Sequence, residues 1–479
     1  MTNTASALLY KLPSLIHLGL DNLVEGAEAA AIAIHKVAFT PPAGGDPLLL
    51  EKLAALRPYA DRIKAANLEA VRRVESSQPA WMGIGIARDV IPTLKPNVFL
   101  HAGPPIAWER MSGPLRGAII GGLLFEGMAK TPEEATHLAA SGGVRFEPCH
   151  HHAAVGPMAG LITPSMPVSI IEDQAGEGKG YRTYCTLNEG LGKVLRYGAY
   201  SQEVLDRLRY MAYELAPLLA RTLAARGPID LKLIMAQALQ MGDEGHNRNR
   251  AGTSLIFREL APPMVGLGSS EEVKRALTFI HQNDHFFLNL SMPMAKCMLL
   301  AAQGTPYASM FSVMARNGTD FGIQLASLPG QWFTGPAQPV KGLYFPGYSA
   351  ADANPDIGDS AITETVGIGA FSMAAAPAIV QFIGGSSEDA LKTTRHMARI
   401  TLAQNSTWAI PSLGFAGAPT GIDLCRCLEL NVLPVINTGI AHKDPGVGQV
   451  GAGLTNPPWA ALHAALGAFV EHCRTCSGL

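Results

Sequence analysis

The stretch LIHLGLDNLVEGAEAAAIAIHKVAFT, residues 15–40, sets the fold class of this 479-residue chain. Its first six residues, LIHLGL, fit a short strand, the middle fits a helix, and a second strand begins near His35. A strand, a helix and a strand in succession are typical of a parallel α/β unit. The PPAGG turn that follows has neither a GxGxxG pattern nor a P-loop lysine, so it lacks a nucleotide-binding fingerprint.

Helices alternate with short apolar strands in the rest of the chain, which predicts the α/β class throughout. We expect a small N-terminal α/β unit with helices in residues 1–95. A larger mixed α/β main domain should occupy residues 96–479 and carry the polar motifs. Within it, a helical section is expected at about residues 200–310.

Local signals predict where several helices begin and end. The amphipathic stretch Ser201–Gly227 starts at a serine cap and stops at a glycine. Capping-box sequences at Thr131 and Ser269 predict two further helix starts. Pro58 should kink or divide the helix that begins near residue 47, because proline lacks the amide hydrogen that a helix interior needs.

The bulk composition favours a well-packed, enzyme-like body. Hydrophobic residues make up 48% of the chain and charged residues 16%, which argues against disorder. The formal net charge of −2 provides no basic excess for nucleic acid or an anionic membrane. Seven cysteines, an odd number without a recognisable signal sequence, indicate reduced thiols and a cytoplasmic protein. Cys473 and Cys476 form a CxxC without a second pair and are treated as coincidental.

The segment VGIGAFSMAAAPAIVQFIGG, Val366–Gly385, is long and uncharged enough to resemble a membrane span. It follows a polar, acidic run, and it has no basic flank or aromatic belt. Its glycines and Pro377 fit a buried helix, which is the interpretation we favour.

Cys149 is followed by three consecutive histidines, His150, His151 and His152. On a strand, His150 and His152 would share a face and His151 would point away. Three interpretations stay open: a structural strand edge, a metal half-site, or an acid/base site. Neither HExxH nor paired CxxC spacing is present, so we favour acid/base chemistry and predict no cofactor, with a divalent metal still possible.

Other polar segments have functional and structural interpretations. In GDEGHNRNR, two arginines and a histidine stand beside paired carboxylates, which indicates either an anion site or a solvated helix end. Arg316-Asn317-Gly318-Thr319 offers similar groups in one turn. DANPDIGD fits two Asx turns and fails the spacing of an EF-hand. No GxSxG elbow is present, which disfavours a serine hydrolase.

A series of these motifs, in order, resembles one bacterial family: EPCHHHAAVGPMAGLITPSMPV, LNEGLGKVLRYGAYS, AQALQMGDEGHNRN, NDHFFLNLSM, MARNGTDFGI, DANPDIGDSAITET, GAPTGID and INTGIAHKDPGVGQVGAG. It is the AllG family, a former family of unknown function represented by a subunit of oxamate carbamoyltransferase. The opening residues resemble the N-terminal unit of its longer members. Gly245 stands where a cysteine is expected before His246, so the resemblance gives no support to a cysteine nucleophile there.

The resemblance implies a subunit that acts in late allantoin breakdown, in purine nitrogen catabolism. Carbamoyl would move between oxalurate and phosphate, giving oxamate and carbamoyl phosphate. The implied partners are these small molecules and further subunits, one of them similar to succinyl-CoA synthetase, and we expect a homo-oligomer as well. No nucleic-acid or membrane partner is expected.

Carbamoyl transfer can be matched to the residue inventory. Anionic substrates need cations, the carbamoyl oxygen needs donors, and a histidine can move the proton. The hypothesis assigns catalysis to His150, His152, His246, His285, Glu189, Asp243 and Asp284. It assigns substrate binding to Asn188, Asn247, Arg248, Arg316, Asn317, Thr319, Asn354, His442 and Lys443.

Two alternatives are kept. One is a metal-dependent amidohydrolase of a ureido or cyclic amide substrate, with the histidines and the DANPDIGD carboxylates as ligands. The other is a non-catalytic assembly subunit whose polar motifs contact partner chains. Stoichiometric metal would favour the first, and ligand binding without partners would argue against the second.

Overall fold

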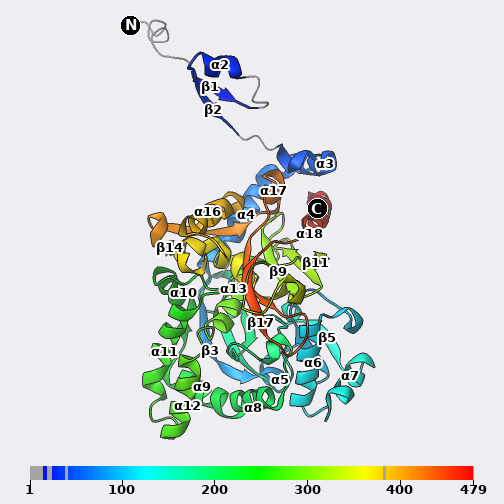
Figure 1. Cartoon of the computed structure of the whole chain (residues 1–479), viewed down its shortest axis with the longest axis vertical. Coiled ribbons are helices and arrows are strands. Elements are labelled where there is room, and N and C mark those ends of the chain that lie inside the picture. Colours follow the sequence, from blue (N-terminus) through cyan, green and yellow to red (C-terminus); the bar gives the residue numbers. More distant parts are fainter. Residues whose placement is uncertain (1–13, 19–23, 38–40, 381–383, 478–479) are drawn as a thin grey trace.

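The computed structural model describes residues 14–18, 24–37, 41–380 and 384–477. Helices account for 47% and strands for 23% of the structure, and the strands form several small sheets, which confirms the α/β class. Figure 1 shows a main body with a small unit that projects from one end.

The projecting unit consists of β1 (Ser14–His17), α2 (Glu25–Ala29) and β2 (Ala33–Lys36). Its two strands pair in parallel with Ser14 opposite Ala33, which confirms the predicted strand–helix–strand unit. Residues 19–23 and 38–40, which belong to the same predicted stretch, lie outside the described residues.

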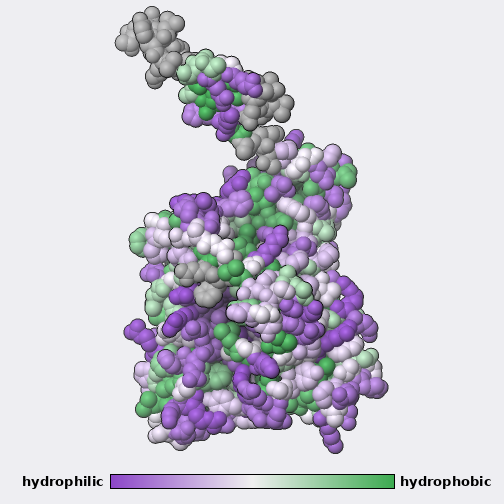
Figure 2. All heavy atoms as spheres, in the orientation of Figure 1, coloured by the Kyte–Doolittle hydropathy of each residue, from purple (hydrophilic) through white to green (hydrophobic). Residues whose placement is uncertain are grey.

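Two helices connect this unit to the body. Asp46 caps α3 (Pro47–Ala55) by accepting from the amides of Leu48 and Leu49. A short 3-10 turn with Pro58 at its centre separates α3 from α4 (Ala60–Ser76), as predicted. A groove of α3, α4 and α17 (Leu424–Glu429) is lined in part by leucines, and Figure 2 shows hydrophobic surface in this region.

An antiparallel sheet of order β7-β6-β3-β8 underlies the body. Its strands are β3 (Pro79–Ile86), β6 (Pro167–Asp173), β7 (Arg182–Thr186) and β8 (Ile229–Asp230). Because β3 pairs with β6, the sheet includes residues from both sides of the predicted division at residue 95. That division stays a prediction.

The expected helical section is present. It comprises α8 (Gln202–Tyr210), a π-helical turn (Met211–Leu215), α9 (Ala216–Arg226), α10 (Leu231–Gln240), α11 (Arg250–Met264), α12 (Ser270–His281) and α13 (Leu288–Ala302). The capping box at Ser269 forms as predicted. Helix α13 is buried along nearly its whole length and packs against α4, β6 and β7, so it is the centre of the largest hydrophobic core.

A second layer contains a parallel strand pair with helices. It consists of β4 (Val98–His101), β5 (Arg145–Pro148), α5 (Ala87–Val90), α6 (Gly113–Phe125) and α7 (Pro132–Ala140). Thr131 caps α7 through the amide of Glu134, as the sequence predicts.

The C-terminal third adds three antiparallel sheets. Their strands are β9 (Phe311–Asn317), β10 (Asp320–Leu325), β11 (Leu328–Pro336) and β13 (Ile357–Gly358); β12 (Lys341–Tyr344), β16 (Ile436–Ala441) and β17 (Gln449–Thr455); and β14 (Thr401–Ile410) with β15 (Ala416–Ile422). The helices are α14 (Ile362–Val366), α16 (Ser387–Met397), α17 and α18 (Trp459–Ser477).

The prediction of one long buried helix at residues 366–385 is wrong, because the described part of this segment is divided into shorter helical pieces. Helix α14 ends at Val366, because Gly367 adopts a left-handed φ of 111°. Two 3-10 segments follow, Gly369–Ala375 and Pro377–Ile379, and the first of them is fully buried. Residues 381–383 lie outside the described part. Among the described residues, no helix is long and apolar enough to span a membrane.

Candidate functional site

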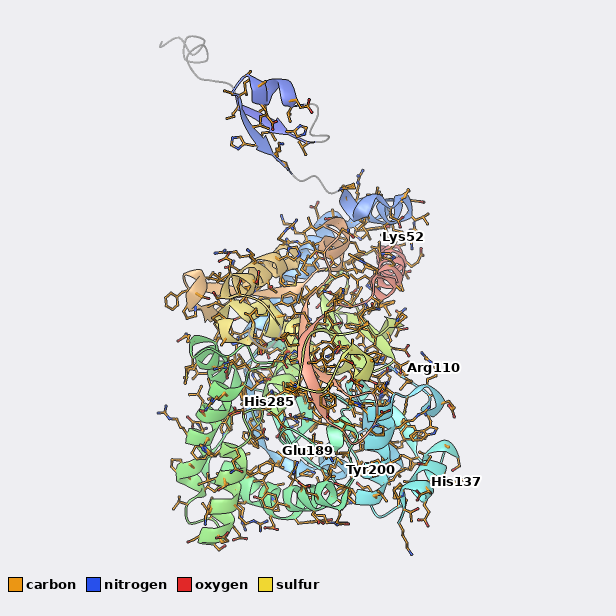
Figure 3. All side chains as sticks on the ribbon, in the orientation of Figure 1. Lys52, Arg110, His137, Glu189, Tyr200 and His285 are labelled. Atoms are coloured by element: carbon orange, nitrogen blue, oxygen red, sulfur yellow. The ribbon has the colours of Figure 1, made fainter. Side chains whose placement is uncertain are left out.

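An inner chamber lies where the loops before α8, α11 and α13 meet β16. It is narrow, since the centres of water molecules fit into only about 20 Å³ of it. Its polar lining includes Arg196, His246, Asn247, His285, Thr438 and Gln449. Figure 3 shows His285 in the interior of the body, whereas His137 and Arg110 lie at its edge.

A wider outer chamber adjoins it. The centres of water molecules fit into about 280 Å³ of it. It is lined by Arg248, Asn249, Arg250 and Asp284, and Phe345 and Ile379 form its apolar wall. Four residues line both chambers: Leu191, Asn247, His285 and Gln449. The chambers are therefore contiguous. They unite four of the predicted site residues, Asn247, Arg248, Asp284 and His285, with a fifth, His246, on the inner side.

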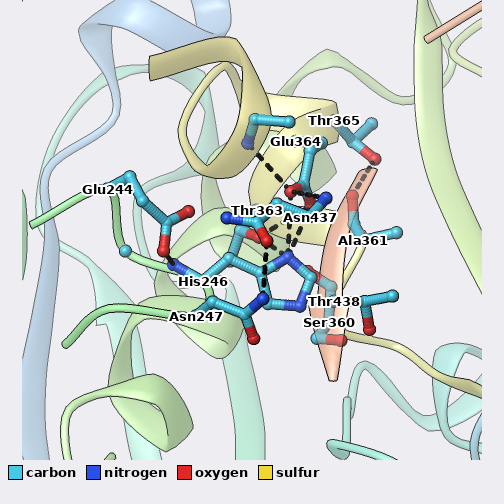
Figure 4. A network of polar contacts seen from close by, with 12 residues as sticks. Glu244, His246, Asn247, Ser360, Ala361, Thr363, Glu364, Thr365, Asn437 and Thr438 are labelled. Atoms are coloured by element: carbon cyan, nitrogen blue, oxygen red, sulfur yellow. Dashed lines mark hydrogen bonds and ion pairs between the residues drawn. The ribbon is translucent and has the colours of Figure 1, made fainter. Parts of the chain in front are cut away.

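A carboxylate fixes the orientation of His246. Nδ1 of His246 lies 2.9 Å from both carboxylate oxygens of Glu364 (Figure 4). Glu364 also accepts from the Thr363 hydroxyl and from the amides of Ala370 and Asn437. Because a carboxylate only accepts, Nδ1 carries the hydrogen, and Nε2 is left as the acceptor of a ring that lines the inner chamber.

A second carboxyl group supports the loop that carries His246. Oε1 of Glu244 accepts from the amides of His246 and Arg248, at 3.2 and 2.6 Å (Figure 4). Burial, and then the nearby charge of Glu364, raise the pKa of Glu244 well above its usual value. Burial thus disfavours the charged form of Glu244. This side chain stabilises the turn at Gly245, whose φ of 85° favours glycine.

Asn247 and His285 lie at the junction of the chambers. Nδ2 of Asn247 donates to Oδ1 of Asn437 at 2.6 Å (Figure 4). Burial, and then the charge of Arg196, lower the pKa of His285 to about 4. The imidazole is thus neutral at pH 7. Its Nδ1 has no hydrogen-bond partner among the described residues, so it is available to a ligand.

Arg196 is the buried cation of the inner chamber, and the sequence-based hypothesis missed it. Its Nη2 donates to the Gly190 carbonyl at 2.6 Å, while Nε and Nη1 have no partner among the described residues. Glu189 positions it by accepting from the amides of Leu195 and Arg196. Leaving buried guanidinium N–H groups unpaired is costly, which indicates a place for an anion. The sequence feature that could have indicated Arg196 is its position in the LNEGLGKVLRYGAYS motif.

The three histidines diverge, so the expected strand arrangement is wrong. Residues 149–152 form a 3-10 turn that ends at Ala153, whose φ of 51° reverses the chain. Nε2 of His150 lies 3.4 Å from Oδ1 of Asp359. His151 accepts from the Trp332 indole, and His152 contacts Thr93 and Glu147.

Asp359 connects the loop of His150 to the loops of Gly103 and Gly156. It accepts from the amides of Gly103 and Gly156, at 2.8 and 3.0 Å. The buried Lys296 of α13 belongs to the same cluster as His150 and Asp359, and burial lowers its pKa to about 8, against the opposing effect of Asp359. A proton-transfer role for His150 or His152 stays a prediction.

Arg316 is held in a buried ion pair. Its guanidinium binds both carboxylate oxygens of Asp356, at 2.6 and 2.8 Å, and also the Gly358 carbonyl and the Thr438 hydroxyl. Its donors are engaged by Asp356, by Gly358 of β13 and by Thr438 of β16, so it has little left for a substrate anion. Asn317 makes the adjacent turn by accepting from the amides of Thr319 and Asp320.

The remaining predicted residues are engaged in local structure. Lys443 donates to the Ala351 carbonyl and is exposed, and His442 accepts from the Asp444 amide. The contacts of the others are Asn188 with Asn283 and Asn289, Thr319 with the Arg110 carbonyl, Asn354 with the Pro355 carbonyl, and Asp243 with the Gly252 amide.

The carboxylates of DANPDIGD do not converge as metal ligands would. Asp352 caps a turn at Ser349, Asp356 binds Arg316, and Asp359 binds two amides. Across residues 14–18, 24–37, 41–380 and 384–477, no group of three or more histidine, cysteine or acidic side chains is placed to hold a metal. The geometry of the described residues gives the amidohydrolase alternative no support.

The low pKa of His285 predicts acid sensitivity. Since the unfolded ring takes up its proton near pH 6.5 and the folded ring only near pH 4, this residue's contribution to the free energy of unfolding falls as pH drops through that window. The loss should approach ~3 kcal/mol. In urea titrations at pH 7 and 4.5, His285→Asn should lose less stability on acidification than the wild type. The exposed His137→Asn should match the wild type, and an unchanged pH dependence in His285→Asn would contradict the assignment.

The fold and the site define an α/β protein with a two-chamber cavity that carries arginine, histidine and amide side chains. A family model described as oxamate carbamoyltransferase subunit AllG matches residues 144–360. An Escherichia coli K12 protein named oxamate carbamoyltransferase subunit AllG is 43% identical over 414 residues, 85% of this chain and 98% of that protein. The chain belongs to the AllG family, as its motifs predicted.

Two further proteins are similar over most of the chain. The uncharacterized protein YahG of Escherichia coli K12 is 44% identical over 96% of this chain and 97% of its own length. A crystal structure of a conserved protein of unknown function from Enterococcus faecalis V583 is 47% identical, with a TM-score of 0.84. It covers 86% of this chain and 98% of its own.

Proposed function

We propose that this chain is the substrate-binding and catalytic subunit of a carbamoyltransferase. It would transfer the carbamoyl group between a ureido acid such as oxalurate and phosphate, and the products would be oxamate and carbamoyl phosphate. This reaction would belong to allantoin and purine nitrogen catabolism. The family and its named relative support a transferase subunit. The observation that carries the proposal is the buried Arg196, whose Nε and Nη1 are unpaired in a chamber shared with His246.

The inner chamber can hold the ureido acid by its carboxylate. The guanidinium of Arg196 has Nε and Nη1 without partners among the described residues, and either can donate a charge-assisted hydrogen bond to a carboxylate. Nδ1 of His285 and the amide of Asn247 then lie beside the carbamoyl group at the junction of the chambers. Donors in this position stabilise the negative charge that builds up on the carbamoyl oxygen.

The transfer balances without a further reactant. An oxygen of dihydrogen phosphate attacks the carbamoyl carbon, and the bond from that carbon to the amide nitrogen breaks. His246 Nε2 accepts one proton of the phosphate and returns it to the leaving nitrogen, which gives carbamoyl phosphate and oxamate. Glu364 stabilises the intermediate imidazolium through Nδ1.

Replacing Arg196 tests the proposal. We expect Arg196→Met to weaken oxamate binding to the full chain at least tenfold, because a charge-assisted hydrogen bond that contributes ~1.5–3 kcal/mol is lost. Calorimetric titration measures it, and Arg196→Lys should recover the charge but only part of the affinity. Arg209→Met is the control, since Arg209 is exposed and pairs with Asp206. Wild-type affinity in Arg196→Met would remove Arg196 from the site.

Partner subunits belong to the proposal, because the relative is named as a subunit. One of them would be the succinyl-CoA-synthetase-like chain, and the chain itself would form a homo-oligomer in the cytoplasm. The alternative, a non-catalytic assembly subunit, predicts no oxamate binding by the isolated chain. The same titration therefore separates the two functions.

A further inference from the structure

We infer that the outer chamber is a second anion subsite, which takes phosphate while the inner chamber takes the carboxylate of the ureido acid. The inference rests on the proposed function and assigns its two substrates to separate cations: Arg196 on the inner side, and Arg248 with Arg250 on the outer side.

The two outer arginines are only loosely paired. Nε of Arg248 lies 3.6 Å from Oδ1 of Asp243 and makes no hydrogen bond to the described residues. Burial also raises the pKa of Asp243 to about 6, which weakens its hold on the arginine as the pH falls. Nε of Arg250 lies 3.8 Å from Oδ1 of Asp284, and both side chains are largely exposed. Both guanidinium groups are therefore available to an incoming anion, in contrast to the fully engaged Arg316.

The first residues of α11 add to the positive potential of this chamber. Asn249 and Arg250 begin this 15-residue helix and line the outer chamber. The Asn249 side chain does not cap the helix, because its Nδ2 donates to the His246 carbonyl. Asp243 accepts from the Gly252 amide at 2.8 Å, so this amide of the first turn is already engaged. The helix start therefore adds its dipole to the chamber, and the arginines supply the groups that an anion would contact.

One buried acceptor distinguishes phosphate from a carboxylate. Asn249 is 1% exposed, and its Oδ1 has no partner among the described residues. An ionised carboxylate has no hydrogen to donate to it. Dihydrogen phosphate, in contrast, can present its charged oxygens to the arginines and one P–O–H to Asn249, and it keeps a second P–O–H for the transfer to His246. The outer chamber thus matches a protonated oxyanion better than it matches oxamate.

The arrangement also brings the reactants together. Asn247 and His285 line both chambers, so an anion on each side of them places the phosphate oxygen next to the carbamoyl carbon. Holding two reactants in this way supplies much of the rate of a group transfer. The wider outer chamber is then the side from which phosphate enters and carbamoyl phosphate leaves.

Separate titrations of the full chain with inorganic phosphate and with oxamate test the inference. We expect Arg248→Met to weaken phosphate binding at least tenfold and oxamate binding less than twofold, and Arg196→Met to do the reverse. Arg258→Met is the matched control, because Arg258 is exposed on the same helix. Arg250→Met should repeat the selective loss of phosphate if Arg248→Met proves poorly folded by circular dichroism.

The inference and the proposed function fail in different ways. Equal weakening of both anions by each variant, or no phosphate binding by the wild type at millimolar concentration, would overturn the two subsites. Selective effects on the two anions, combined with no carbamoyl transfer by the chain assembled with its partners, would support the subsites and overturn the proposed function.

Discussion

Replacing Glu364 with glutamine should lower the kcat of the assembled enzyme by about 10²-fold or more. Glu364 accepts the Nδ1 hydrogen of His246, and this fixes Nε2 as the ring's acceptor. A glutamine can keep one acceptor for Nδ1 and for the amides of Ala370 and Asn437, all of which contact Oε1 of Glu364. It removes the negative charge that stabilises the imidazolium of His246 during the transfer. The loss should therefore fall on kcat more than on KM, because the substrate contacts of Arg196 are untouched.

The pH profile separates this positioning role from a purely structural one. If Glu364 sets the proton affinity of His246, the acidic limb of the kcat profile should shift in Glu364→Gln, whereas simple destabilisation would scale the whole profile. Glu388→Gln is the matched control, since Glu388 is exposed in α16. His246→Asn should show a loss of kcat of similar size. A Glu364→Gln enzyme within threefold of the wild-type kcat would contradict the mechanism.

Replacing Asp356 with alanine should reduce the free energy of unfolding by ~3–5 kcal/mol, because it leaves the guanidinium of Arg316 buried without its counter-ion. Both side chains are fully buried, and the pair joins β9 to the residues before β13. Arg316 reaches further, to Thr438 on β16, so the loss should spread through two sheets. Urea-induced unfolding followed by fluorescence measures the change.

Asp320→Ala is the control for this effect. Asp320 pairs with the exposed Arg110 at 2.7 Å, and such a surface pair contributes only ~0–1 kcal/mol. Oxamate and phosphate titrations of folded Asp356→Ala should give near wild-type affinities. A large loss of anion affinity without loss of stability would instead return Arg316 to the binding site, and equal destabilisation by both variants would refute the buried pair as the cause.

The candidate site was predictable in part. The motif around His246 indicated an anion site, and the structure places His246, Asn247, Arg248, Asp284 and His285 around contiguous chambers. Arg196 was missed although it lies in the LNEGLGKVLRYGAYS motif, close to Glu189 and Gly190. Glu364 was not assigned to the site because its partner His246 is 118 positions away in the sequence. The histidine run was misleading, since residues 149–152 form a short 3-10 turn and not the strand on which the predicted faces depended.

The sequence by itself determined the features that depend on neighbouring residues. Asp46, Thr131 and Ser269 cap helices through groups two or three positions away, and Pro58 divides a helix because of its own missing amide hydrogen. The parallel α/β unit and the family follow in the same way, from patterns readable along the chain.

Only the tertiary structure decided which charged groups are free. His246 and Glu364 are 118 positions apart, and Arg316 and Asp356 are 40 apart. The energy of a buried charge depends on which distant segment brings its partner within hydrogen-bonding distance. The residues next to the charge in the sequence do not indicate which segment this is. For this reason Arg316, which the sequence offered as an anion site, became part of the core, while Arg196 was left with unpaired donors in the inner chamber.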